Sequence, residues 1–136
     1  MKDQSYSVFP LSDLVKDLGK RRTQEYLGTF RLYKDSDAGF FLSKKALMME
    51  DRDLSRTYLA MDSNDEIMGF ISLGIKCLSI PEKSLLSDRM IQDMFIDPKT
   101  GVVQAFLLAQ IARSESSHHG FGIELINLAM DVFEKA

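Results

Sequence analysis

Hydrophobic and polar residues alternate with two different periods along the chain, and the change of period divides it into segments. Near the N-terminus, the helical period predicts a short helix over Leu11–Leu18 that ends at Gly19. A second helix is predicted to start at Ser36–Asp37 and to run through Met49, because apolar residues recur there at helical spacing. The basic run Lys20–Arg22 fits a solvated helix end and is given no function.

From Arg56 the period shortens to two, which is typical of strands. Thr57–Met61 is predicted to form one strand, Asp62–Asp65 a turn and Ile67–Leu78 a second strand, so the segment should fold as a hairpin. Alternation divides the second strand into two faces, Ile67, Gly69, Ile71, Leu73, Ile75 and Cys77 against Met68, Phe70 and Leu78. Both sets are mostly apolar, so both faces of this hairpin are expected to be covered.

The last third of the chain predicts a strand and a helix joined by a polar loop. Residues 79–101 have no clear period and are expected to form a long irregular connection. The apolar run Val102–Ala112 predicts a central strand buried on both faces. A polar loop, Arg113–His119, then leads into a helix that opens at Gly120–Gly122. The order of these helices and strands predicts an α+β or α/β fold.

Composition narrows the functional classes. A chain of 136 residues with 45% hydrophobic residues is expected to form one globular domain over residues 1–136. Its formal net charge of −3 argues against binding nucleic acid through bulk positive charge. The single cysteine, Cys77, cannot form an internal disulfide, and no apolar run reaches membrane-spanning length. We therefore expect a soluble cytoplasmic protein with no membrane partner.

The loop before the last helix carries the clearest chemical motif. A strand, a polar loop, a glycine pair and a helix bring successive backbone amides and the positive helix end toward one anion. The residues concerned are Ser117, His118, His119, Gly120, Phe121 and Gly122. A Gly-x-Gly pair taken alone also fits an ordinary tight turn between a strand and a helix.

This segment resembles the GNAT N-acetyltransferases, which carry Q/R-x-x-G-x-G/A between their fourth strand and third helix to hold the pyrophosphate of coenzyme A. Here the motif reads S-H-H-G-F-G: Gly120 and Gly122 match, whereas Ser117 stands where Gln or Arg is usual. Leu107–Ala112 is similar to the strand of the branch that includes GNAT toxins, which often reads L-L-x-R-L-A-V. The hairpin is similar to the same branch, and the resemblance spans about residues 40–136.

The resemblance implies an incomplete GNAT-like fold, with a mixed, mainly antiparallel sheet flanked by helices, that runs from the N-terminal helices through the pyrophosphate-loop helix. The family continues with a fifth strand, another helix and two more strands, but this chain stops at Ala136. We therefore expect a truncated chain, a natural remnant or a sheet that another chain completes. An open edge on the last strand would favour a homodimer, and the toxin branch implies an antitoxin-like partner.

By the same resemblance, the function is that of an acetyl-CoA-dependent N-acetyltransferase, or of its acetyl-CoA-binding portion, acting on an unidentified amine. Three strand residues would run beside pantetheine through their backbone groups, and residues 117–123 would hold the pyrophosphate. The implied cofactor-binding residues are Ile111, Ala112, Arg113, Ser117, His118, His119, Gly120, Phe121, Gly122 and Ile123. No catalytic base or acid is nominated, because Glu115 fits a solvated loop carboxylate better, and the adjacent histidines lack companions for a metal site.

Two other functions remain open from the sequence. A non-catalytic GNAT-like binding or regulatory module is favoured by the missing C-terminal elements, unless the chain has been cut. A different α+β domain, whose helix N-terminus binds some other phosphate, would also carry this loop.

Overall fold

The computed structural model describes residues 5–31, 37–79 and 102–135. By its internal contacts the chain divides into two compact units. The first contains Met1–Gly74 and Leu108–Ala136, and the second contains Ile75–Leu107. All the described helices and the first two strands belong to the first unit, whereas β3 and β4 contribute residues to both.

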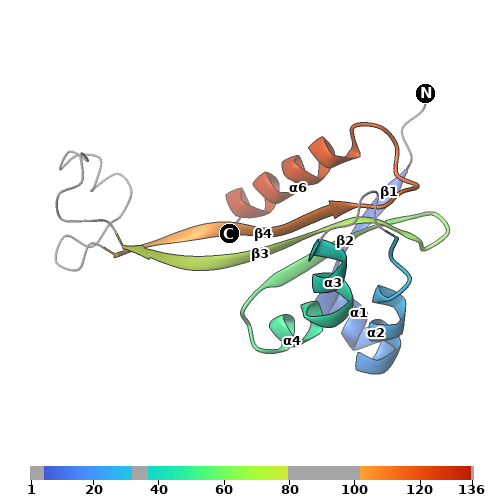
Figure 1. Ribbon diagram of the computed structural model, residues 1–136, viewed down its shortest axis with the longest axis horizontal. Helices are drawn as coiled ribbons and strands as arrows, with labels where there is room; N and C mark the ends of the chain where they lie inside the picture. The colour runs from blue at the N-terminus through green and yellow to red at the C-terminus, as the bar shows by residue number, and fades with distance from the viewer. Residues whose placement is uncertain (1–4, 32–36, 80–101, 136) are drawn as a thin grey trace. The chain divides into compact units, whose positions relative to one another are not determined.

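The described strands form one sheet in the order β1-β2-β3-β4 (Figure 1). Their bounds are Tyr6–Pro10 for β1, Arg56–Asp62 for β2, Ile67–Ser79 for β3 and Val102–Arg113 for β4. β1 pairs antiparallel with β2, which pairs antiparallel with β3. The expected hairpin and the mainly antiparallel sheet flanked by helices are therefore confirmed.

Helices cover both faces of the sheet in the first unit (Figure 1). The described helices are α1 (Leu11–Leu18), α2 (Lys20–Leu27), α3 (Asp37–Lys44), α4 (Ala46–Asp51) and α6 (Phe121–Lys135). One buried cluster joins α1–α4 to the sheet through Leu11, Leu27, Phe41, Leu42 and Phe70. A second joins α6 to the opposite face through Met68, Ile71, Phe121, Leu125 and Ala129. The sheet is thus a layer between two apolar cores.

The helical predictions for the N-terminal half were partly wrong. The single helix predicted from Ser36–Asp37 to Met49 is two helices, α3 and α4, because the backbone leaves the helical region at Lys45, with φ −122°. The basic run Lys20–Arg22 begins α2 instead of ending α1, since Gly19 turns the chain between them with φ 82°. The three basic side chains are exposed, as predicted.

A bulge overturns the predicted alternation in β3. Ala60 of β2 pairs with Gly69, but the next residue, Met61, pairs with Ile67, which leaves Met68 as an extra residue. Ile67 consequently joins Phe70 in the core under α1–α4, and the side chain of Met68 faces α6 instead. Residues 67–73 are all buried, so the expected covering of both faces is confirmed over that stretch.

The prediction of a central, doubly buried last strand is wrong for the residues whose side chains are described. β4 is the terminal strand in the order of the described sheet, the side chain of Leu107 is 42% exposed, and Ala109 is exposed. An apolar run does not reveal whether a neighbour covers it. The predicted irregular connection, residues 79–101, lies outside the described residues except for Ser79, which ends β3.

Candidate functional site

The loop between β4 and α6 is tied to the rest of the first unit by backbone hydrogen bonds. The Ser114 N–H donates to the carbonyl of Met68 on β3 at 2.7 Å, and the Glu115 N–H donates to the carbonyl of Arg31, after α2, at 2.9 Å. Ser117 closes a turn by donating its N–H to the Ser114 carbonyl at 3.2 Å. The loop is therefore held from both the sheet and the helical layer.

The head of α6 presents unused backbone donors. Phe121 donates its N–H to the His118 carbonyl at 3.2 Å, and Ile123 donates to the Gly120 carbonyl at 3.1 Å. Within the described residues, the N–H groups of His119, Gly120 and Gly122 donate to no protein acceptor. A helix N-terminus with unpaired amides carries partial positive charge, so this end of α6 favours an anion.

The two motif glycines leave the space beside these amides open. A Cβ added at Gly120 or at Gly122 would meet no other atom within 4 Å. Gly120 also has φ 85°, a conformation that side-chain-bearing residues rarely adopt. Gly69 is different, because a Cβ there would lie 2.8 Å from the Ala112 carbonyl oxygen, so this glycine serves the packing of β3 against β4.

Two predicted site residues pack inward and anchor the loop on α6. The His118 side chain is buried, with Nε2 hydrogen-bonded to the Glu124 carboxylate, and its ring meets the Phe121 ring edge-on at 5.1 Å. Phe121 is fully buried and also meets Tyr6 of β1 edge-on, at 5.0 Å. Burial, together with the nearby Glu124 carboxylate, raises the pKa of the Tyr6 hydroxyl. The His119 side chain is exposed.

The side chain of Arg113 reaches the loop, a contact that the sequence reasoning missed. Its Nη1 donates to the Ser117 hydroxyl oxygen at 3.3 Å and lies 3.5 Å from the His118 carbonyl oxygen. The Ser117 hydroxyl in turn donates to the Ser114 carbonyl at 2.8 Å. The sequence shows only that Arg113 and Ser117 are four residues apart. This spacing does not predict a contact until the path of the loop is known.

The backbone groups at the end of β4 point alternately to the two edges of the strand. The Ser114 N–H bonds to β3, and the Ala112 carbonyl lies against Gly69 of β3. Successive residues of a strand direct their N–H and C=O groups to opposite edges. The backbone groups of Ile111 and Arg113 therefore face away from β3, toward the edge where the described sheet has no further strand.

The predicted site residues thus fall into two adjoining segments. Ile111, Ala112 and Arg113 end β4, whereas residues 117–120 belong to the loop and Phe121, Gly122 and Ile123 begin α6. The side chain of Ile123 is 67% exposed and that of Phe121 is buried, so only their backbones belong to an anion site. No group of three or more metal-ligating side chains occurs in the described parts of the chain, and no described helix is long and apolar enough to span the bilayer.

A pocket of about 460 Å³ adjoins the loop on the side of α2 and α3. Its lining includes Phe30 and Arg31 after α2, Phe40 and Ser43 of α3, and Glu115 of the loop. The Glu115 side chain is exposed. An acidic and a basic side chain therefore flank a partly aromatic hollow that reaches the loop at Glu115.

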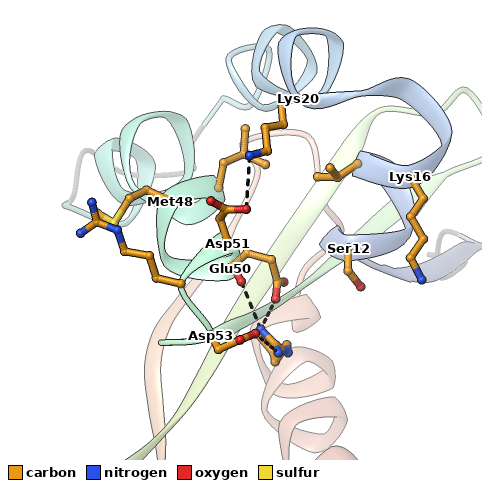
Figure 2. Close-up of a pocket in the computed structure, with 11 residues that line it drawn as sticks. Ser12, Lys16, Lys20, Met48, Glu50, Asp51 and Asp53 are labelled. Carbon is orange, nitrogen blue, oxygen red and sulfur yellow. Dashed lines mark hydrogen bonds and ion pairs between the residues drawn. The ribbon is translucent and has the colours of Figure 1, made fainter.

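A larger pocket, of about 560 Å³, lies between α1 and α4 and has a different character (Figure 2). Figure 2 shows Lys20 paired with Asp51. The Lys20 Nζ lies 3.2 Å from the Asp51 Oδ1. Arg56 pairs with the nearly buried Glu50 at 2.6 Å and with Asp53 at 2.5 Å. The lining of this pocket includes no residue of the β4–α6 loop, and two of its four cations, Lys20 and Arg56, have carboxylate partners. These ion pairs link α2 to α4 and α4 to β2, which is a structural role.

Comparison with known proteins identifies the fold. No protein-family model matches the sequence, and no curated protein matches it. Among solved structures, AtaT complexed with acetyl-methionyl-tRNAfMet is 16% identical with a TM-score of 0.67, covering 95% of this chain and 69% of that one. A tyrosine-to-phenylalanine mutant of KacT is 14% identical, with a TM-score of 0.66 and the same coverage. AtaTR bound with AcCoA is 17% identical, with a TM-score of 0.60, covering 97% and 66%. The chain therefore has the GNAT-like fold of these acetyltransferase toxins, over about two thirds of their length.

Proposed function

We propose that this chain binds acetyl-CoA at the β4–α6 loop and serves the transfer of its acetyl group to an amine. The observation that carries the proposal is the set of three open amides, His119, Gly120 and Gly122, at the head of α6. They adjoin the open edge of β4, on a fold whose solved examples include complexes with acetyl-CoA. In this proposal the amides hold the pyrophosphate, and pantetheine runs along Ile111–Arg113.

The proposed reaction is a direct transfer. The amine nitrogen attacks the thioester carbonyl carbon, a C–N bond forms, and the C–S bond breaks to release the thiolate of coenzyme A. One proton leaves the amine for water or a base, and one proton returns to the thiolate, so the reaction is balanced. The part assigned to this chain is to position the thioester and to offer outward-facing N–H groups of β4 to the carbonyl oxygen as it becomes negative.

The acceptor to test first is the α-amino group of an aminoacyl-tRNA, because AtaT is complexed with acetyl-methionyl-tRNAfMet. The pocket beside Glu115 and Arg31 adjoins the loop and suits an approach from that side. Two protein partners also belong to the proposal. One is an antitoxin-like protein, since AtaT binds the C-terminus of the antitoxin AtaR, and the other is a second copy along the open edge of β4. We place the protein in the cytoplasm, where the single thiol of Cys77 stays reduced.

Calorimetric titration with acetyl-CoA tests the binding step, with acetyl-pantetheine as the ligand that lacks the phosphates. Acetyl-CoA should bind more tightly than acetyl-pantetheine, because only the former fills the amide cradle. A folded chain that binds neither ligand would refute the proposal. Release of free thiol from acetyl-CoA in the presence of an aminoacyl-tRNA would then separate an acetyltransferase from a non-catalytic module, which binds the cofactor without turning it over.

A further inference from the structure

The β4–α6 loop lacks the long hydrogen-bonding side chain, Gln or Arg, that the GNAT motif places in it. Ser117 stands at the position of the motif's Gln or Arg, so the side chain there carries no charge. Amide N–H groups donate hydrogen bonds, but charge-assisted bonds from a guanidinium to phosphate are stronger. A charged donor from another position would therefore strengthen a site that has serine at residue 117.

Arg113 has the position and the charge for this role. It is the only lysine or arginine between Lys99 and Lys135, and the other formally charged side chains of residues 113–124 are Glu115 and Glu124. Without Arg113, this segment would carry a formal charge of −2 beside a proposed anion site, counting the histidines as neutral. The Glu124 carboxylate is hydrogen-bonded to His118, and the Glu115 side chain is exposed.

The geometry brings the Arg113 charge to the missing side chain. Nη1 of Arg113 lies 3.3 Å from the Ser117 hydroxyl, so the guanidinium lies beside the side chain that stands at the motif's Gln or Arg position. The serine hydroxyl is itself held by its bond to the Ser114 carbonyl, and it orients the guanidinium by accepting from it. A planar guanidinium held in this way suits two oxygens of one phosphate group.

We propose that the Arg113 guanidinium supplies, from the end of β4, the charged donor that an arginine at residue 117 supplies in the Arg form of the GNAT motif, and that it contacts the pyrophosphate of acetyl-CoA. This inference rests on the proposed function. It gives the side chain of Arg113 a role in binding phosphate, whereas the family resemblance implies only a backbone role for this residue. It also explains how a serine is tolerated at position 117.

The test moves the charge from one position to the other. Arg113→Gln keeps hydrogen-bonding groups near Ser117 but removes the charge, and it should weaken acetyl-CoA binding by about 10- to 100-fold, the usual effect of losing a charged hydrogen bond. Binding of acetyl-pantetheine, which has no phosphates, should not change. Adding Ser117→Arg to the Arg113→Gln variant should restore most of the lost affinity for acetyl-CoA, which a purely structural role of Arg113 does not predict.

The controls keep the two proposals separable. Arg113→Lys, which retains the charge without the planar fork, should lose less affinity than Arg113→Gln, and it serves as the second variant if the glutamine variant melts at a lower temperature. Equal acetyl-CoA affinity in the parent and the folded Arg113→Gln variant would overturn this inference and leave the proposed function standing. Equal losses for acetyl-CoA and acetyl-pantetheine would also overturn it. No acetyl-CoA binding by the folded parent would refute the proposed function itself.

Discussion

Replacing Gly122 with aspartate is expected to remove acetyl-CoA binding without weakening the fold. Gly122 lies in the first turn of α6, its φ is not positive, and a Cβ there has open space. Aspartate exceeds glycine in helix propensity by a few tenths of a kcal/mol. A carboxylate in the first turn adds about 0.3–1 kcal/mol through the helix dipole. The melting temperature should therefore stay level or rise by a few degrees.

The same carboxylate would stand where the pyrophosphate is proposed to bind. At a separation of about 5 Å and an effective dielectric constant of about 20, repulsion from one phosphate charge amounts to about 3 kcal/mol. Since each 1.4 kcal/mol is a factor of about ten, the dissociation constant should rise by about 100-fold or more. Calorimetry gives the affinity, and thermal unfolding gives the stability. Gly122→Asn, which is similar in size but uncharged, should retain much more affinity than Gly122→Asp. A folded Gly122→Asp variant that binds acetyl-CoA as the parent does would refute this reasoning.

Three further predictions concern the fold. Gly69→Ala should lower the free energy of unfolding by about 1–3 kcal/mol, because the new Cβ would lie 2.8 Å from the Ala112 carbonyl oxygen and 2.9 Å from the Leu125 side chain. Urea unfolding measures this loss, with Gly122→Ala as the control, because a Cβ at Gly122 has room. Phe70→Ala should cost about 3–5 kcal/mol, since the ring is fully buried and packs against two other phenylalanines, and an unchanged urea midpoint would contradict the described core. Burial, followed by the Asp65 charge, raises the pKa of the Tyr26 hydroxyl to about 12. The stability that the protonated hydroxyl contributes is therefore present below about pH 10 and is lost as the pH rises toward about 12. This pH-dependent loss of unfolding free energy should be absent in Tyr26→Phe.

The parts of the fold that the sequence predicted are those with local signals. The hairpin follows from a short polar turn, Asp62–Asp65, between two apolar strands, and Asp65 indeed adopts a positive φ of 61° there. The start of α6 was signalled by the glycine pair, of which Gly120 has the conformation that glycine favours. These features depend on a few adjacent residues, so they can be seen without the tertiary structure.

The parts that were missed depend on contacts between distant segments. The break at Lys45 leaves the apolar spacing unchanged, since Leu42 and Ala46 are buried on either side of it. The bulge at Met68 is hidden because β3 is apolar on both faces there, and a one-residue slip does not alter such a pattern. β1 is too short for alternation to identify it before the pairing with β2 is known.

The candidate site divides in the same way. The glycine motif located the loop, and the structure adds which of its amides donate to no acceptor among residues 5–31, 37–79 and 102–135. It also separates the inward-facing His118 from the exposed His119, which adjacent positions in the sequence do not distinguish. The contact of Arg113 with Ser117 depends on the path of the loop, so it was not predictable from residue types alone.

The most direct test of the central claim follows the backbone amides during a titration with acetyl-CoA by ¹H–¹⁵N NMR of the whole chain. The account predicts that the amide signals of His119, Gly120 and Gly122 shift most, together with those of Ile111 and Arg113 on the open edge of β4. Acetyl-pantetheine should shift the two strand amides and leave the three loop amides nearly unchanged. Saturable binding of acetyl-CoA that leaves all three loop amides in place, or that shifts the residues of the α1–α4 pocket instead, would contradict it.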